Sequence, residues 1–419
     1  MSELMKLSTI VCLVVSVYWL TGCNNKAAQN SIPLTVKENI TGSPQIFGIP
    51  IPQGELYSID HVRVLNESGQ EVPSQITKVT TWEPADTSIK WIWVFFFTEE
   101  GNVYNLEYGG DVRNGLDYDQ ELYVKNNQRT NGEVIVDTGV LRFTIERGGS
   151  GFFDKVELDT DENGYDQNDV IAKGAKYRGS FLDILDDAGI DGSRAIIKRT
   201  VKELGSGPLH SIIRVEGEYQ YSNEDNNVSP FVTRIHSYAG KSYVKILHTI
   251  TYTGNPDKHQ KVEGEYEAIA TSDGKIIDEE KLKNDEGWMQ PDDRIESAGL
   301  SLIYNLNKEK KISTAYSNGR WWESGNLSRF TESIPDDKTI SMYQSGPSPD
   351  AVPPLLNSSE DNRIEKSFVS TLHAGEKELY KNERSTGWID ISDQKWGITI
   401  GIRNFFEEYP KEIKNFMWP

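Results

Sequence analysis

Hydrophobic and polar residues alternate in short runs along most of the chain from residue 32 onward. The runs are rich in Val, Ile, Thr, Tyr and Trp, and Gly, Asn, Asp or Ser separate them. This pattern is typical of β-strands that each bury one face. Strands are predicted at Leu56–Leu65, Thr87–Phe97, Val134–Ile145, Ser211–Tyr221, Phe231–Ala239 and Tyr243–Thr253. The chain is therefore predicted to be an all-β protein with long loops.

Three segments depart from this alternation. In Trp91–Phe97, aromatic residues alternate with Ile, Val and Phe, so both faces of the strand are apolar and burial on both sides is expected. Helical periodicity is scarce, and one or two helical turns are expected at Lys275–Trp288 and at Asn404–Phe416. Helices are therefore expected to contribute little to the core.

The N-terminal residues have the pattern of a bacterial lipoprotein signal. Lys6 precedes an apolar run from Leu7 to Leu20, which is shorter than the roughly 20 apolar residues of a permanent membrane-spanning helix. The run ends in Leu20-Thr21-Gly22-Cys23, which resembles a lipobox. Residues 1–22 are predicted to be a signal peptide, Cys23 a lipid anchor and residues 23–35 a tether. The expected location is the cell envelope, as an outer membrane lipoprotein on the periplasmic face or at the cell surface; an ordinary secretory signal is the alternative.

Charge and cysteine content narrow the classes of function. The formal net charge of -20 repels nucleic acid and the sequence has no basic cluster, so no nucleic-acid partner is expected. The two cysteines are Cys12, inside the signal, and Cys23, so the mature body has no thiol for a disulfide and needs a large core. Aromatic residues make up 10% of the chain, which suits stacking on sugar faces, although large β cores use them as well.

Two groups of segments resemble the exo-rhamnogalacturonan lyase-like family. The early group is Phe47–Gly54, Val72–Gln75, Trp82 and Ser88–Trp91 leading into Ile92–Phe97, and it is similar to that family's N-terminal domain. The late group is Arg403–Phe406, Tyr409-Pro410 and Trp418-Pro419, and it is similar to the end of the second domain. The resemblance implies a small RIFT-type β-barrel at residues 36–115 and a central β-sandwich at residues 130–419, joined by the turn-rich stretch around residues 109–132.

In a full-length relative the resemblance also implies a C-terminal α/α toroid. The sequence ends where that toroid is expected to begin. If catalysis needs groups from the toroid, a complete lyase is expected to require a separate toroid-bearing chain as a partner.

The residues Arg234, His236 and Tyr238 are the candidates for catalysis. They occupy positions i, i+2 and i+4 of one predicted strand, so their side chains share a face. Elimination from a uronate needs a cation for the carboxylate, a base for the C5 proton and an acid for the leaving oxygen, and Arg, His and Tyr can fill these roles. The next strand is expected to bring Lys245 or His248 nearby, according to its register. A polar outer sheet face, or a buried His satisfied by its neighbours, is the structural alternative.

Two further motifs are candidates for binding. The cation and indoles of Arg320, Trp321 and Trp322 are suited to an acidic sugar, although adjacent Trp residues of a strand face opposite ways and at least one is expected to enter the core. The run from Asp159 through Asp161 and Asn163 to Gly164 matches the opening of a calcium loop. The twelfth position is Val and no flanking helices are evident, so a solvated acidic turn is favoured and no cofactor is firmly predicted.

Two hypotheses from different classes follow. In the first, the chain is a membrane-anchored lipoprotein of a polysaccharide-degradation system, related to lyases that act by β-elimination on rhamnose and uronate polymers of the rhamnogalacturonan or ulvan type. In the second, it is a noncatalytic glycan-binding lipoprotein. Both predict an acidic polysaccharide or oligosaccharide as the partner.

Overall fold

The structure is a computed structural model. It describes residues 30–37, 40–83, 87–115, 118, 122–129, 132–148, 152–173, 179–185, 195–220, 228–252, 294–304, 306, 310–317, 327–334, 338–346 and 368–415. Within these ranges the regular structure consists of β-strands and two short 3-10 turns, η1 (Ile59–His61) and η2 (Gln167–Asp169), so the all-β prediction is confirmed. The described residues include no helix long and apolar enough to span a bilayer. The chain divides into two compact units, Met1–Ile303 and Tyr304–Pro419.

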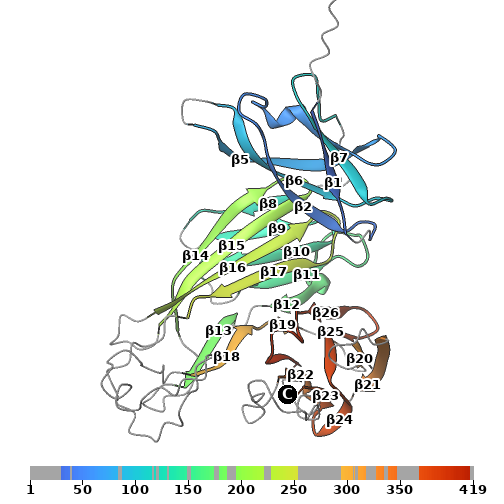
Figure 1. Ribbon diagram of the computed structural model, residues 1–419. Helices are drawn as coiled ribbons and strands as arrows, with labels where there is room; N and C mark the ends of the chain where they lie inside the picture. The colour runs from blue at the N-terminus through green and yellow to red at the C-terminus, as the bar shows by residue number, and fades with distance from the viewer. Residues whose placement is uncertain are drawn as a thin grey trace, which may run out of the picture. The chain divides into compact units, whose positions relative to one another are not determined.

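The first domain of the first unit is built from two small sheets (Figure 1). Its strands are β1 (Asn30–Thr35), β2 (Pro44–Pro50), β3 (Val62–Leu65), β4 (Glu71–Val72), β5 (Ser74–Thr81), β6 (Ile89–Phe97) and β7 (Val103–Tyr108). One sheet has the order β1-β7-β3-β4 and the other the order β2-β6-β5. Alternate residues of these strands, such as Val62, Val64, Ile92, Val94 and Leu106, are fully buried and form one hydrophobic core. The period-two pattern therefore specifies the inner face of each strand.

Strand β6 buries one face completely and the other only in part. Trp91 is 36% exposed and Trp93 is 45% exposed, whereas Phe95 on the same face is buried. The expectation that this strand is buried on both sides is therefore wrong for the two Trp residues. Phe95 is covered because the rings of His210 and Tyr238, from the second domain, stack on it with centroid distances of 4.8 and 5.9 Å.

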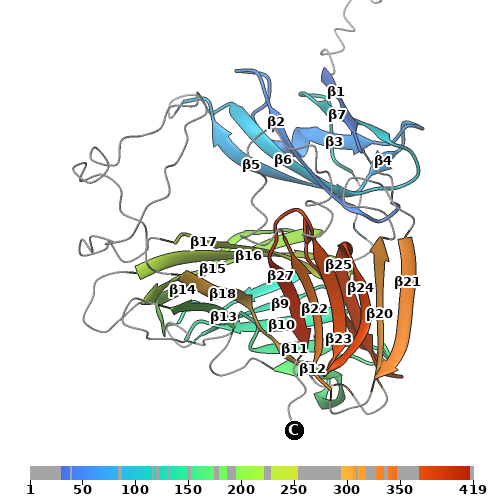
Figure 2. The same ribbon diagram turned by 60° about the horizontal axis from the view of Figure 1, so that its bottom comes forward.

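The second domain consists of two larger sheets that lie as two layers (Figures 1 and 2). Five neighbouring strands of one sheet are β8 (Tyr123–Asn126), β9 (Glu133–Asp137), β10 (Leu141–Glu146), β11 (Lys155–Leu158) and β12 (Val170–Lys173). Those of the other are β14 (Ala195–Ser206), β15 (His210–Gln220), β16 (Val228–Tyr238) and β17 (Val244–Ile250), side by side in chain order. β13 (Ser180–Leu185) pairs with β18 (Arg294–Leu300). Buried side chains such as Val136, Phe143, Ile213, Val215 and Ile235 form the inner faces.

The second unit has a core of its own. After β19 (Ile303–Tyr304), its strands are β20 (Lys310–Ser317), β21 (Leu327–Ile334), β22 (Ile340–Ser345), β23 (Val369–Ala374), β24 (Lys377–Asn382), β25 (Arg384–Ser392), β26 (Gly397–Gly401) and β27 (Lys411–Asn415). They form two sheets, β21-β20-β25-β26 and β24-β23-β22-β27. Ile312 and Ile389 from the first sheet share a hydrophobic core with Met342, Leu372 and Ile413 from the second.

Of the helical turns expected at residues 404–416, only one helical-type hydrogen bond forms, from the Glu408 amide to the Asn404 carbonyl oxygen at 3.0 Å. Residues 403–408 are turns, and the chain then continues as β27, which pairs with β22. Asn404 has φ 52°, in the left-handed region, and Pro410 cannot donate a backbone hydrogen bond, so a continuous helix is excluded. The other expected helical segment, Lys275–Trp288, lies outside the described residues.

Candidate functional site

The three candidate catalytic residues share the outer face of β16. Arg234, His236 and Tyr238 alternate there with Thr233, Ile235 and Ser237, which are completely buried toward the interior of the sandwich. Because successive residues of a strand point to opposite sides of the sheet, the first three form a set on the other side. Arg234 is half-buried, and His236 and Tyr238 are buried.

The register of β17 decides which of its residues joins this set. Lys245 lies directly opposite His236, whereas His248 lies opposite Thr233. Lys245 is exposed on the face of His236. His248 faces the interior, where its Nδ1 lies 2.8 Å from the Thr233 hydroxyl and its Nε2 lies 3.4 Å from the Ser180 hydroxyl. The outer face therefore contains Lys245 and not His248.

A second histidine supports His236 from the start of β15. Nε2 of His210 lies 3.0 Å from Nδ1 of His236, and the two rings stack with centroids 5.2 Å apart. The side chain of Gln75, on strand β5, holds this end of β15 by accepting from the His210 amide at 2.8 Å and donating to its carbonyl oxygen at 3.0 Å. Phe95 stacks on the other side of the His210 ring. The histidine pair is thus fixed where the first domain meets the second.

Burial keeps both histidines neutral near pH 7. Burial lowers the pKa of His210 to about 3, with smaller contributions from His236 and Lys245. Burial also lowers the pKa of His236 to about 4, and the positive charges of Lys245 and Arg234 act in the same direction. Nε2 of His236 is buried and has no hydrogen-bond partner within the described part of the chain. A neutral imidazole with an unengaged ring nitrogen can accept or donate one further hydrogen bond.

Tyr238 completes the set as a protonated phenol. Burial, followed by the neighbouring Tyr243, raises the pKa of Tyr238 to about 12. Its ring stacks on His210 at 5.3 Å and lies against Tyr243 at 5.5 Å. At neutral pH the face therefore combines the cations Arg234 and Lys245, a neutral imidazole pair and a phenol that can donate a hydrogen bond. Arg214 lies directly opposite Arg234 on β15 and forms an ion pair with Glu216.

Several members of this arrangement were not predicted from the sequence. His210, Gln75 and Phe95 belong to other strands, and the long-range packing that joins them to His236 leaves no local motif. One signal was available for the aromatic row: Trp91, Trp93 and Phe95 recur at every second position, which places them on one face of β6. Trp93 lies opposite Gly48 and Thr77 and is 45% exposed.

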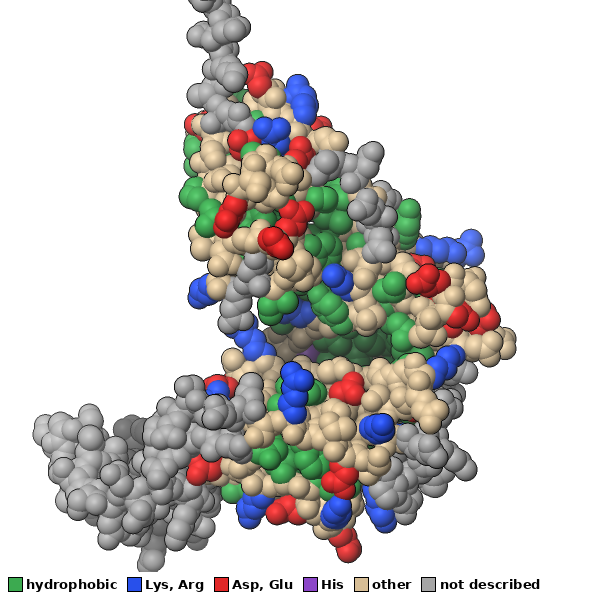
Figure 3. All heavy atoms as spheres, turned by 90° about the vertical axis from the view of Figure 1, so that its right-hand side faces the viewer, with side chains coloured by type: hydrophobic (Ala, Val, Ile, Leu, Met, Phe, Trp, Pro, Cys, Tyr) green, Lys and Arg blue, Asp and Glu red, His purple; other side chains and the backbone are tan. Residues whose placement is uncertain are grey.

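The net negative charge of the chain does not appear as one continuous acidic patch in the view of Figure 3. There Lys and Arg side chains lie interspersed with Asp and Glu, and hydrophobic side chains occur between them. Charges of opposite sign at close spacing cancel at distances beyond a Debye length of about 8 Å at physiological salt. Local side chains, and not the net charge, therefore decide what this face binds.

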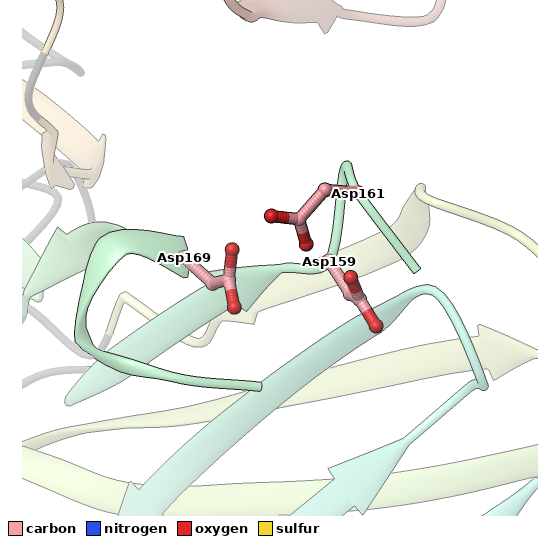
Figure 4. Close-up of side chains that lie close together, drawn as sticks. All are labelled: Asp159, Asp161 and Asp169. Atoms are coloured by element: carbon pink, nitrogen blue, oxygen red, sulfur yellow. The ribbon is translucent and has the colours of Figure 1, made fainter. Parts of the chain in front are cut away.

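The predicted calcium residues are only partly brought together. Oxygen atoms of Asp159, Asp161 and Asp169 lie within 4.8 Å of one another (Figure 4). The amide of Asn163 instead donates to the Asp161 carboxylate at 2.9 Å. Asp169 is buried at the end of η2 and was not predicted, because it lies eight residues beyond Asp161 and outside the alternating pattern. Three carboxylates could supply oxygen ligands to a calcium ion, and exposed turns with such groups also occur without one.

The remaining predicted residues cannot be placed. Arg320, Trp321 and Trp322 lie outside the described residues, and so does Cys23. Their roles in sugar binding and in lipid anchoring stay predictions.

Comparison with known proteins identifies the two domains of the first unit. Residues 34–95 match the PcRGLX-like N-terminal RIFT barrel domain, and residues 124–264 match the PcRGLX-like protein central beta sandwich domain. Two stretches of this chain are thus similar to the first two domains of PcRGLX-like proteins. The resemblance to exo-rhamnogalacturonan lyase-like proteins is thereby confirmed, as is the order of a RIFT-type barrel followed by a β-sandwich. The PcRGLX-like domains relate the chain to rhamnogalacturonan lyases.

A longer bacterial relative covers most of the chain. The Bacillus subtilis (strain 168) protein named "Uncharacterized protein YetA" is 22% identical over an alignment of 398 residues, and the match covers 90% of this chain. The match spans 41% of the length of YetA. This chain therefore spans less than half the length of that relative.

Proposed function

We propose that this PcRGLX-like chain binds a rhamnose and uronate polysaccharide, of the rhamnogalacturonan or ulvan type, within a polysaccharide-degradation system. The observation that carries the proposal is the common outer face of Arg234, His236, Tyr238 and Lys245 in a domain related to rhamnogalacturonan lyases. A uronate has a carboxylate and several hydroxyl groups. This face offers matching partners for both.

The electrostatics of the face favour an anion. The two side-chain charges that act on His236, those of Lys245 and Arg234, are both positive. Each can form a charge-assisted hydrogen bond with a carboxylate, and a guanidinium can do so through two parallel bonds. The unengaged Nε2 of His236 and the phenol of Tyr238 are buried, so they can bond sugar hydroxyls only if neighbouring side chains move. The expected contribution is about 1.5–3 kcal/mol for each charged contact.

The aromatic row of β6 extends the same face onto the first domain. Phe95 stacks on His210 and Tyr238, and Trp93 and Trp91 follow it at every second position along the strand. Both indoles are partly exposed, and flat exposed rings stack on the faces of pyranose sugars. A polymer bound at Arg234 therefore has a second contact surface for neighbouring sugar units.

A specific observation also favours elimination chemistry as a second candidate. His236 is neutral near pH 7, as a base for the C5 proton must be, and Tyr238 is protonated, as an acid for the leaving oxygen must be. Arg234 would neutralise the carboxylate. Nε2 of His236 is nevertheless buried, so a substrate proton reaches it only if neighbouring side chains move. Binding is for this reason the leading proposal.

The test measures binding and cleavage in parallel. The chain without its first 22 residues is incubated with rhamnogalacturonan and with ulvan, and unsaturated uronate is followed by its ultraviolet absorbance. We expect saturable binding, with little product. Lys245→Gln and Arg234→Gln should each weaken binding about tenfold, the equivalent of one charge-assisted contact. Lys198→Gln is the matched control, because Lys198 lies on the same sheet and its charge is paired with Glu218 at 2.9 Å.

The outcomes separate the two candidates. Robust product that disappears in His236→Ala and in Tyr238→Phe would make the chain a self-sufficient lyase. Product that forms only after a separate toroid-bearing chain is added would support a divided enzyme. Neither binding nor cleavage, in a protein shown to be folded, would contradict both candidates.

We further propose that Cys23 anchors the protein to a membrane of the cell envelope, such as the outer membrane. The support is the lipobox-like Leu20-Thr21-Gly22-Cys23 after a short apolar run. Cys23→Ser should move the protein from the membrane pellet to the soluble fraction, because no other cysteine is left in the mature chain to carry acyl groups. A variant that stayed in the pellet like the wild type would contradict this anchor.

A further inference from the structure

The other sheet of the sandwich has a hollow on its outer face. The hollow has a volume of about 730 Å³, which suits one or two sugar units. It lies on the side of β9 and β10 opposite to Val134, Val136, Phe143 and Ile145, which are completely buried. Its lining consists of Tyr123, Lys125, Glu133, Ile135, Asp137, Arg142, Thr144, Glu146, Asp154, Lys155 and Glu157.

The strand register arranges this lining in rows. Ile135 and Thr144 lie opposite each other and form a small floor, and Lys125 lies opposite Ile135 on the edge strand. Tyr123 lies opposite Asp137 on the same edge, with 65% of its surface exposed. The hollow thus has an apolar floor, an aromatic ring on one side and charged groups around it.

One end of the hollow is held by internal bonds. Arg142 donates two hydrogen bonds to Glu157, at 2.8 and 2.7 Å, and Lys155 forms an ion pair with the same carboxylate at 3.0 Å. The phenol of Tyr165 donates to Asp137 at 3.1 Å. These side chains already have partners, which fixes their positions before any ligand arrives.

At the other end of the hollow lie the charged side chains of Glu133, Glu146 and Lys125. Glu133 and Glu146 lie directly opposite each other on neighbouring strands. Like charges in this position destabilise a sheet. Within the described residues neither carboxylate accepts a side-chain hydrogen bond, and the ammonium group of Lys125 forms no ion pair. The guanidinium of Arg199, which donates to the Glu146 carbonyl oxygen, attracts the Glu146 carboxylate, so Glu133 has the less compensated charge. A ligand that donates hydroxyl groups to both carboxylates would relieve this repulsion.

We propose that this hollow is a second saccharide site that takes a neutral sugar, a hexose or 6-deoxyhexose unit, and that it goes beyond the acidic polymer site proposed above. The ring would lie on Ile135 and Thr144 beside Tyr123, donate hydroxyl hydrogens to Glu133 and Glu146, and accept from Lys125. The lining has five carboxylates and three cations, so a uronate would meet repulsion here. The two outer faces of the sandwich then bind different units of one heteropolymer.

The experiment uses the same chain without its first 22 residues, with rhamnobiose and galactobiose as neutral probes and digalacturonate as the charged probe. Binding is measured by calorimetry for the wild type and for Tyr123→Ala and Glu133→Gln. We expect at least one neutral probe to bind, and each variant to weaken it tenfold or more. Tyr57→Ala is the control, because Tyr57 is 62% exposed on the first domain and belongs to neither site.

Two readouts distinguish this site from the acidic site and from a loss of folding. Lys245→Gln should weaken digalacturonate binding and leave the neutral probe unchanged. Glu133→Gln should leave the melting temperature unchanged or raise it, because it removes one of two opposed charges, while the neutral sugar is lost. Failure of the wild type to bind either neutral probe, equal affinity in Tyr123→Ala, or digalacturonate binding that is lost in Glu133→Gln would overturn the proposal.

Discussion

The two outer faces of the central sandwich have the same backbone architecture and opposite chemistry. On β16 and β17 the face beside the first domain carries Arg234 and Lys245 around a neutral histidine pair. On β9 and β10 the corresponding face carries the opposed carboxylates Glu133 and Glu146. In both sheets the inner face is buried and largely apolar, with Thr233, Ser237 and His248 as polar members on β16 and β17. The inner faces thus provide stability, and the outer faces are left free to differ in what they bind.

The faces also differ in how far they are removed from water. The ring of Phe95 covers His210, and burial lowers the pKa of both histidines. The hollow around Tyr123 is open, and Tyr123 itself is mostly exposed. Charges in low dielectric interact more strongly than charges that water and salt screen. The histidine face should therefore be sensitive to mutation and pH, and the hollow much less so.

Removal of the Phe95 ring should have the largest effect on the difference in solvent exposure between the two faces. Phe95→Ala should lower the free energy of unfolding by about 3–5 kcal/mol, because a buried aromatic ring and its stacking partners are lost. Water would then reach His210 and His236, whose pKa values should rise toward 6.5. Denaturant unfolding and NMR titration of the histidines measure the two effects. Tyr123→Ala, on the open face, should change stability by less than about 0.5 kcal/mol, and an equal loss in both variants would contradict the comparison.

A change of pH tests the same difference without a mutation. The pKa of His236 is about 4 in the folded protein and about 6.5 in the unfolded chain, so below pH 6.5 the unfolded state binds more protons. Stability should therefore be full above pH 6.5 and fall as pH drops toward 4, by about 3 kcal/mol for this group. Lys245, Arg234, His210 and Tyr238 are the titratable groups that surround it.

The matched control for the pH experiment is His236→Gln. This variant should reduce, and not abolish, the loss of stability between pH 6.5 and 4. Its side chain cannot be protonated there, whereas His210 and His248, whose pKa values burial lowers to about 3 and about 4, still bind protons on unfolding. A profile as steep as that of the wild type would show that His236 is not the group responsible.

Calcium binding at the three aspartates beside the acidic sheet is expected to change the melting temperature only slightly. The three carboxylates of Asp159, Asp161 and Asp169 lie close together, but Asn163 bonds within the turn and does not add to them. Millimolar calcium should shift the melting temperature by less than about 2 °C. A large shift that Asp159→Ala with Asp161→Ala abolishes would instead identify a metal site beside the acidic sheet.

Local pattern located most of the strands and the faces of individual residues. It was wrong in extending one strand over Leu56–His61, where the chain forms a loop and the turn η1, and in joining β9 and β10 into one strand. The alternation around residues 231–239 correctly put Arg234 and Tyr238 on one side of a strand, because side-chain direction in a strand depends only on sequence parity. The same rule could not choose between Lys245 and His248. That choice depends on the register between β16 and β17, which the turn before β17 and the packing of both strands determine.

Contacts between distant segments could not be predicted either, because they too depend on how strands pair and pack. Trp93 and Phe95 have the same local pattern, yet one is partly exposed and the other buried, because the second domain covers only Phe95. The pairing of His210 with His236 likewise depends on β15 and β16 lying side by side. Asp169 joined Asp159 through the turn η2, which local propensity did not indicate.

Recognition of a uronate carboxylate by Arg234 and Lys245 is tested most directly by comparing one oligosaccharide with and without its charge. A rhamnogalacturonan oligosaccharide and its carboxyl-reduced form, which keeps every ring but replaces uronate by neutral hexose, are titrated into the same protein. We expect carboxyl reduction to weaken binding at the face of Arg234 and Lys245 by tenfold or more. In Lys245→Gln, the two ligands should bind with nearly the same affinity. Equal affinity for both ligands in the wild type would contradict recognition of the carboxylate by this face.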